Sequence, residues 1–256
     1  MKTTHTTNAY WWQAIEKVID EKYTQIIHHD RFLKVLDLGC GDGTNIFRLS
    51  ALNSDATYFG FDMDTEAIQR AERYVLDNGL KNIHFLKKDI IHDAFPEHQF
   101  DVVICSEVME HLYDNEKVII MNKINKSLKQ GGFLIVTTPT PECFFRKVYE
   151  NDSFIIRKIV DFIFQNTYKQ RILADFSYGR HHHIGVCDSW YYKKLFVRKG
   201  FVLIATEPTS VFQYELPVYI RAIFNFLFIK INPFSIKFSA SLVFVCKKES
   251  DIIVDY

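Results

Sequence analysis

The chain has 256 residues, of which 48% are hydrophobic and 15% aromatic. This length fits one domain, or one domain with an insertion, and the apolar residues suffice for a buried core. Lys and Arg number 31 and so do Asp and Glu, giving a formal net charge of zero. Because a sequence-independent hold on phosphate backbones needs a basic surface, this balance argues against nucleic acid as a partner.

The cysteines and the N-terminal residues indicate the compartment. Five cysteines are scattered without a C-x-x-C pair, which argues against a disulfide framework or a thiolate zinc site and suggests a reducing environment. Residues 1–9 are polar, so no secretory signal is predicted. No apolar run reaches 18 residues, so no ordinary transmembrane helix is expected. We therefore expect a cytoplasmic protein.

Strands and helices are predicted to alternate along the chain. In chain order we expect helix 9–28, strand 34–38, a helix ending near 52, strand 57–61, helix 65–78, strands 82–86 and 100–105, helix 115–129 stopped by Gly131-Gly132, strand 133–137, helix 188–199 capped by Asp188, strand 201–206, helix 217–231 and strand 242–246. This pattern predicts an α/β fold, with a Rossmann-like, seven-stranded, mostly parallel sheet and helices on both faces.

The alternation is interrupted once, after the fifth strand. Residues 142–183 have a helical pattern rich in Phe, Ile and Lys. We interpret them as a helical insertion or lid at the C-terminal edge of the sheet, within a single domain that covers residues 1–256.

A glycine-rich turn follows the first strand and precedes a helix, where nucleotide-binding turns are found. It reads Asp37-Leu-Gly-Cys-Gly-Asp-Gly43. Glycines let the main chain turn tightly and let a ligand approach without meeting a Cβ atom. A dinucleotide fingerprint needs G-x-G-x-x-G, but here the third glycine arrives one residue early and an Asp leads the motif. Both features argue against NAD or FAD.

The Asp-x-Gly-x-Gly-x-Gly pattern resembles that of class I S-adenosylmethionine-dependent methyltransferases, and the resemblance extends from about residue 10 to 246. It implies S-adenosylmethionine as the cofactor. Asp37 would orient the loop and the methionine amino group, Asp62 would bind the ribose hydroxyls, and Asp89 would receive the adenine amino group. The other cofactor-binding residues implied by the resemblance are Gly39, Cys40, Gly41, Met63, Ile90 and Ser106.

A Glu-x-x-Glu-His cluster follows the fourth strand, at the sheet edge where α/β folds bind ligands. It consists of Glu107, Glu110 and His111. One interpretation, which we favour, is a structural turn or cofactor contact. Glu110 or His111 could also act as a general base. The cluster could instead bind a divalent metal that lowers the pKa of an acceptor hydroxyl; this is not favoured, and no metal ligand is assigned.

The same cluster resembles two methyltransferase subfamilies that place such residues on a metal. One contains the ubiquinone-type O-methyltransferases. The other contains the small-RNA terminal 2′-hydroxyl methyltransferases, which add a downstream histidine; His183, in the run 181–183, has the best offset for that role. This run is either an exposed loop or a histidine that closes over the acceptor. The catalytic candidates are therefore Glu110, His111 and His183.

The C-terminal region is unusually apolar. Residues 216–248 contain no Asp or Glu, and 218–231 are apolar almost all round. Fourteen residues are too few to span a bilayer. The segment is either a packed helix or an interfacial helix that brings the enzyme to the inner membrane face, where a lipid-linked acceptor would lie.

Three functions follow from these patterns. The first is methyl transfer to a small-molecule or lipid-linked acceptor, at oxygen. The second is a metal-assisted RNA 3′-terminal 2′-O-methyltransferase, which the zero net charge disfavours. The third is a non-catalytic scaffold, which the complete set of cofactor-contact residues argues against. No oligomeric state is predicted.

Overall fold

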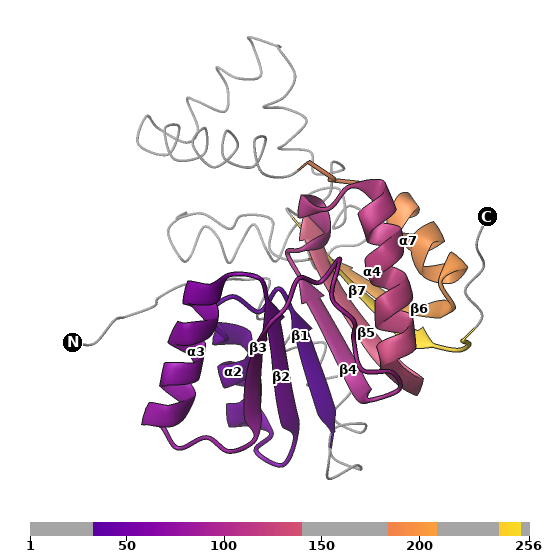
Figure 1. Ribbon diagram of the computed structural model, residues 1–256. Coiled ribbons are helices and arrows are strands. Elements are labelled where there is room, and N and C mark those ends of the chain that lie inside the picture. Colours follow the sequence, from indigo (N-terminus) through magenta and orange to yellow (C-terminus); the bar gives the residue numbers. More distant parts are fainter. Residues whose placement is uncertain (1–32, 140–183, 209–240, 252–256) are drawn as a thin grey trace, which may run out of the picture.

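The protein is represented by a computed structural model, which describes residues 33–139, 184–208 and 241–251 (Figure 1). Four sequence predictions lie outside the described residues: helix 9–28, the insertion at 142–183, helix 217–231 and the placement of His183.

The described residues form a seven-stranded sheet with the strand order β3-β2-β1-β4-β5-β7-β6. In chain order the strands are β1 Lys34–Leu38, β2 Thr57–Asp62, β3 Ile83–Lys87, β4 Phe100–Ser106, β5 Leu128–Pro139, β6 Phe201–Pro208 and β7 Ser241–Lys248. Strand β7 runs antiparallel to its neighbours β5 and β6, and the other pairs are parallel. The predicted Rossmann-like, mostly parallel sheet is confirmed.

Helices cover both faces of this sheet, as predicted (Figure 1). They are α2 Thr44–Leu52, α3 Thr65–Asp77, α4 Asp114–Ser127 and α7 Ser189–Arg198, with a short 3-10 turn, η1, at Met109–His111. Buried residues of α2 and α3 belong to one apolar cluster, and those of α4 and α7 belong to the other. The sheet therefore separates two cores.

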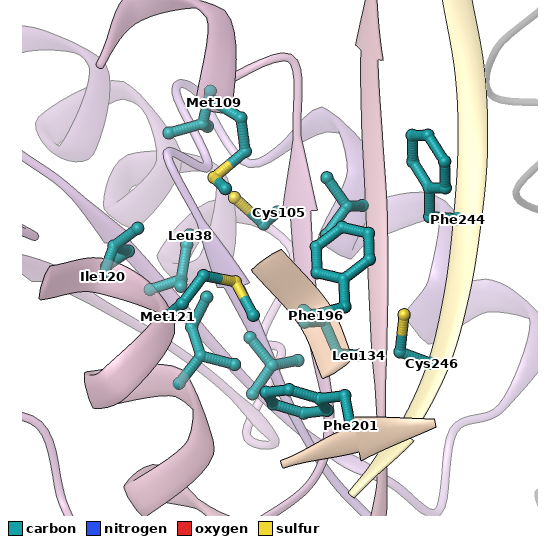
Figure 2. Packing of buried hydrophobic residues seen from close by; sticks show 14 of the residues in the cluster. Leu38, Cys105, Met109, Ile120, Met121, Leu134, Phe196, Phe201, Phe244 and Cys246 are labelled. Atoms are coloured by element: carbon teal, nitrogen blue, oxygen red, sulfur yellow. The ribbon is translucent and has the colours of Figure 1, made fainter. Parts of the chain in front are cut away.

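Strand β1 shows how the sequence divides between these cores. Val35 packs with α2 and α3, whereas Leu36 and Leu38 pack with α4 and α7. Figure 2 shows the second core, with Met121 of α4 and Phe196 of α7 directed toward the sheet. An apolar run in β1 is needed because both of its faces are buried.

The predicted helix boundaries have local causes. The Asp64 carboxylate caps α3 by accepting hydrogen bonds from the Glu66 and Ala67 amides, at 2.9 and 3.2 Å. Gly79, with φ of 63°, follows the end of α3. Asp188 caps α7 through the Tyr191 amide at 2.7 Å.

The predicted boundary between helix 115–129 and strand 133–137 is wrong. Helix α4 ends at Ser127 and β5 begins at Leu128. Leu128 pairs with Phe100 and Phe133 pairs with Val102, so the register shifts between these pairs. Gly131, at φ of 76°, lies in this irregularity. The two glycines therefore accommodate a bulge inside the strand and do not stop the helix.

Among the residues that the structure describes, no helix has both the length and the apolar character needed to cross a membrane.

Candidate active site

The glycine turn lies at the C-terminal end of β1. Gly39, Gly41 and Gly43 have φ of 69°, 53° and 80°, in the left-handed region that favours glycine. The amides of Gly39 and Cys40 donate to the Phe61 carbonyl of β2, at 2.8 and 3.2 Å. The turn is therefore fixed to the neighbouring strand before any ligand is considered.

The three glycines are required for different reasons. A Cβ atom on Gly39 would lie 2.5 Å from Val108 Cγ2, and one on Gly43 would lie 2.4 Å from Phe85 Cζ. A Cβ atom on Gly41 would meet no atom of the described chain within 4 Å. Gly39 and Gly43 thus serve packing, whereas Gly41 presents bare main chain to open space.

Asp62, at the end of β2, is joined directly to this turn. Its Oδ2 accepts a hydrogen bond from the Gly41 amide at 2.7 Å, and its Oδ1 accepts one from the Asp64 amide at 2.8 Å. Each carboxylate oxygen can accept a further bond. The half-buried carboxylate therefore remains able to receive hydroxyl donors while its position is fixed by two main-chain bonds.

Asp37 is almost fully buried, with 1% of its surface exposed. Burial raises the pKa of its carboxyl to about 7, and the charge of Asp62 adds to this, whereas a hydrogen bond with Asn45 opposes it. Its Oδ2 has no hydrogen-bond partner within the described residues. Since an unpaired buried acceptor is costly, the position suits a ligand that brings a donor or a positive charge.

The turn after β3 carries Asp89 and Ile90, and Met63 follows the end of β2. Asp89 Oδ1 accepts the Ile91 and His92 amides at 2.9 and 3.2 Å, and Oδ2 lies 2.8 Å from His92 Nδ1. The bond with His92 lowers the Asp89 pKa most. Met63 is 69% exposed. Parallel pairing of β1, β2 and β3 thus brings all three predicted acids to adjacent strand ends.

Two predicted cofactor residues have side chains committed to packing. The Cys40 thiol lies in the core beneath the turn, and burial raises its pKa. The hydroxyl of buried Ser106 is 2.7 Å from Thr137 Oγ1. These geometries leave the main chain of Cys40 and Ser106 as the part of each residue that would contact a ligand.

The Glu-x-x-Glu-His cluster lies beside the glycine turn, because β4 pairs with β1 through Leu38 and Cys105. Glu107 adopts φ of 54°, which is unusual for a residue with a side chain and costs about 1–3 kcal/mol. Glu110 lies in η1 and is fully buried. Strain and burial of this kind persist only where the surrounding structure imposes them.

The two glutamates form a carboxyl pair. Their side chains hydrogen-bond to each other. Burial raises the pKa of both, and for Glu110 the nearby charge of Glu107 raises it further, well above the usual range. Two close buried carboxyls cannot readily ionise together, so the pair retains a proton at a pH where an exposed glutamate has lost it.

A group of hydroxyls surrounds the pair, and sequence reasoning missed it. Thr138 Oγ1 donates to Glu110 Oε2 at 3.2 Å and lies 3.4 Å from the Tyr192 hydroxyl. Glu107 bonds the side chains of Thr137 and Ser241. The Thr137-Thr138 doublet at a strand end was the available signal. Ser241 could not be found, because its place depends on the antiparallel register that pairs it with Pro139.

One oxygen of each carboxyl, Oε1, is buried without a hydrogen-bond partner in the part of the chain that is described. The His111 ring is 44% exposed, and its Nε2 lies 4.0 Å from Glu110 Oε1, too far for a hydrogen bond. Glu110 and His111, two of the predicted catalytic candidates, thus lie side by side without a direct hydrogen bond between these two atoms. Over its described ranges it contains no cluster of three or more His, Cys, Asp or Glu arranged to hold a metal ion.

Comparisons with known proteins identify methyltransferases as relatives of this chain. A family model described as a methyltransferase domain matches residues 29–177. The ubiquinone biosynthesis O-methyltransferase of Citrobacter koseri is 35% identical over 105 residues, covering 41% of this chain and 42% of that protein. That of Haemophilus ducreyi is 36% identical over 110 residues, covering 41% and 44%. The chain thus matches less than half the length of these relatives.

Solved structures share the fold. An S-adenosylmethionine-dependent methyltransferase from Mesorhizobium loti has a TM-score of 0.60 at 14% identity, covering 94% of this chain and 99% of its own. The magnesium protoporphyrin IX methyltransferase of Synechocystis, with bound S-adenosylhomocysteine, has a TM-score of 0.58 at 16% identity, covering 94% and 84%.

The sheet order, the glycine turn and the acids beside it define a class I S-adenosylmethionine-dependent methyltransferase. Because the family model covers more than half of its residues, the chain belongs to the methyltransferase domain family.

Proposed function

We propose that this enzyme methylates a hydroxyl oxygen of a small-molecule or lipid-linked acceptor. The observation that carries the proposal is the buried carboxyl pair of Glu107 and Glu110, with raised pKa values, beside the glycine turn. A hydroxyl must lose a proton when its oxygen is methylated, and a carboxylate of raised pKa is suited to receive it. The names of the curated relatives, ubiquinone biosynthesis O-methyltransferases, support an oxygen acceptor.

The residues at the ends of β1, β2 and β3 fit S-adenosylmethionine. The open space at Gly41 leaves room for the nucleoside, and the unpaired Asp37 oxygen suits the methionine ammonium group. In this proposal Asp62 binds the ribose hydroxyls and Asp89 the adenine amino group. Met63 and Ile90 pack on the adenine faces. The remaining contacts come from the main chain of Gly39, Cys40 and Ser106.

When bound, the cofactor supplies a methyl group already activated by its sulfonium. The protein must therefore chiefly orient the acceptor in line with the carbon–sulfur bond, which accounts for a large part of the barrier reduction. In its ionised form, Glu110 takes the proton from the acceptor hydroxyl. Glu107 holds the Glu110 carboxyl by their mutual hydrogen bond. Half-exposed His111, whose Nε2 lies 4.0 Å from Glu110 Oε1, passes the proton to solvent through an intervening water.

The role of His183 rests on chain connectivity. Gly185 donates its amide to the Glu110 carbonyl at 2.8 Å, and His183 is two residues earlier in the sequence. We propose that His183 contacts the acceptor from this side. Gly185 cannot carry a side chain, because a Cβ atom there would lie 1.8 Å from the Leu112 carbonyl oxygen.

A methyl-transfer screen tests the proposal. The purified protein is incubated with methyl-labelled S-adenosylmethionine and with quinone precursors, polyprenyl-linked sugars or short RNAs. We expect label on a hydroxyl of a quinone precursor or a lipid-linked acceptor, and turnover that is unchanged by EDTA. Label on RNA, or no label on any hydroxyl acceptor, would overturn the proposal. Loss of activity in EDTA would replace the proton-acceptor role of Glu110 with a metal-ligand role.

A further inference from the structure

We propose that Lys123, on α4, is a positioning residue that sets the selectivity of the enzyme for the adenine amino group. It would do so by holding the 88–95 turn, defined as Lys88–Phe95, against the sheet. The inference rests on the proposed contact between Asp89, in this turn, and that amino group. Lys123 belongs to neither the glycine turn nor the carboxyl pair.

One ammonium group collects three main-chain carbonyls of the turn. Lys123 Nζ donates to the carbonyl oxygens of Ile90 at 3.2 Å and Asp93 at 2.8 Å, and also to that of Ile91. A lysine has three N–H donors. All three are therefore accounted for by carbonyls that converge from consecutive parts of a single turn.

The shape of the turn is fixed by its own bonds. Asp89 and Asp93 bond reciprocally: the Asp89 amide donates to Asp93 Oδ2, and the Asp93 amide donates to the Asp89 carbonyl, each at 2.8 Å. The Asp89 carboxylate accepts the amides of Ile91 and His92. These bonds are internal to the turn and determine its shape. Its first residue is tied to β2, because the Lys88 amide donates to the Asp62 carbonyl at 2.9 Å, so other contacts must place the residues that follow Asp89.

Lys123 provides one such contact, from helix α4. It reaches the turn from the middle of α4, whose buried face packs on β1, β4 and β5. Its Nζ also lies 5.4 Å from the centre of the Phe95 ring, which packs edge-on against Phe61 of β2 at 5.6 Å. The turn is thus linked to the helix through one cation, and to the sheet through the Lys88 amide and one ring.

The electrostatic setting agrees with a specific role. Desolvation lowers the Lys123 pKa, while the charges of Asp89 and Asp93 oppose this. Desolvation of the Lys123 ammonium costs free energy, and its three hydrogen bonds all go to one turn. Both features distinguish it from a lysine that is surrounded by water at the surface. If the ammonium is removed, three carbonyls lose their donor, and the residues that follow Asp89 lose their link to α4. The Asp89 carboxylate, which accepts amides from those residues, is then less firmly oriented.

The test compares Lys123→Met with Lys126→Met in the full chain. Lys126 lies on the same helix and its side chain is exposed. Calorimetry measures the dissociation constants of S-adenosylhomocysteine and S-inosylhomocysteine, in which an oxygen replaces the adenine amino group. Because Asp89 is proposed to accept a hydrogen bond from the adenine amino group, the wild-type protein and Lys126→Met should bind S-adenosylhomocysteine more tightly than S-inosylhomocysteine. In Lys123→Met we expect the affinity for S-adenosylhomocysteine to fall about tenfold, which is the value of one strong hydrogen bond. The affinity for S-inosylhomocysteine should change little.

The ratio of the two dissociation constants separates positioning from general destabilisation. A purely structural lysine would lower the melting temperature and leave the ratio in the folded protein unchanged, and that result would overturn the proposal. If Lys123→Met does not fold, Lys123→Arg carries the same expectation, because a planar guanidinium cannot place one donor group at three converging carbonyls. Failure of the wild-type protein to bind either compound would instead overturn the proposed cofactor site.

Discussion

The carboxylates in the two halves of the candidate site have different kinds of hydrogen-bond partner. In the cofactor half, at the ends of β2 and β3, Asp62 and Asp89 accept main-chain amides. In the acceptor half, after β4, Glu107 and Glu110 are bonded to each other and to hydroxyl side chains. Main-chain bonds fix the position of a carboxylate, whereas a shared proton and hydroxyls allow it to change protonation state.

This contrast suggests a division of labour. In the proposed function, the cofactor half binds one ligand with little rearrangement. The acceptor half contains raised pKa values and two buried carboxyl oxygens without a partner among the described residues, which is costly for stability and useful for proton transfer. Asp37 is the exception in the cofactor half, because it is buried and its Oδ2 is unpaired.

The largest expected effect is in the acceptor half. With an acceptor from the screen, Glu110→Gln should lower kcat about a thousandfold, within the range for loss of a general base. Its affinity for S-adenosylhomocysteine should remain that of the wild-type protein, because Glu110 lies outside the cofactor half. A variant that lost affinity and kept kcat would contradict the division.

The pH dependence of kcat sharpens the same test. The burial-raised pKa of Glu110 means that its carboxylate form is present at high pH and is lost as the pH falls. The wild-type acid limb should therefore lie above the range of an exposed glutamate, and it should be absent from the residual activity of Glu110→Gln. A pH profile that is identical in the two proteins would exclude Glu110 as the proton acceptor.

A smaller effect is expected at Asp62. Asp62→Ala removes the two charge-assisted bonds that we propose to the ribose, and it should weaken S-adenosylhomocysteine binding about a hundredfold. Asp64→Ala is the matched control, because it removes the cap of α3 and should cost about 1 kcal/mol of stability without changing affinity. Equal affinities of the two variants would show that Asp62 is only a turn residue.

The two glycines with contrasting surroundings provide the next comparison. Gly41→Ala should weaken cofactor binding about tenfold, because the new methyl group enters the space proposed for the ligand. Gly39→Ala should mainly lower the free energy of unfolding, by about 1–3 kcal/mol, because its methyl group meets Val108. Thermal unfolding and calorimetry on both variants check this. If Gly41→Ala instead lowered stability and Gly39→Ala weakened binding, the ligand space would not lie at Gly41.

The last prediction concerns the exception, Asp37. Its pKa of about 7 in the folded protein, against 3.8 ordinarily, means that folding favours the protonated form and that stability is lost as pH rises between these values. At 1.4 kcal/mol per pKa unit, Asp37→Asn should raise the free energy of unfolding at pH 8 by up to about 4 kcal/mol. Wild-type affinity for S-adenosylhomocysteine should decline as the pH falls below 7, and this decline should vanish in Asp37→Asn. Denaturant unfolding of the two proteins at pH 5 and pH 8 measures the first effect.

The two halves also differ in how far the sequence predicts them. Asp37 and Asp62 lie near the ends of β1 and β2, and Asp89 follows β3, so parallel pairing places all three at the predicted edge of the sheet. Their contacts with a cofactor stay a prediction. Chain order sufficed for these residues. It failed where spatial register decides: Ser241 joins Glu107 only through the antiparallel pairing of β5 and β7. Chain order also misplaced the start of β5, since a glycine pair has the same sequence signature in a strand bulge and at a helix end.

Buried side-chain direction was the other obstacle. Cys40 lies within the glycine motif, yet its thiol lies in the core, and Ser106 is held by Thr137. Sequence spacing identifies which residues approach a ligand, but rotamer and packing decide whether the main chain or the side chain makes the contact. Lys123 illustrates the converse, because a lysine in an amphipathic helix gives no signal that three carbonyls will converge on it.

Calorimetric titration of the intact protein with S-adenosylhomocysteine tests the central claim most directly. The proposed division predicts one binding site per chain, with the same dissociation constant in the wild-type protein and in Glu110→Gln. A folded wild-type protein that releases no heat and shows no thermal stabilisation with this nucleoside would contradict it.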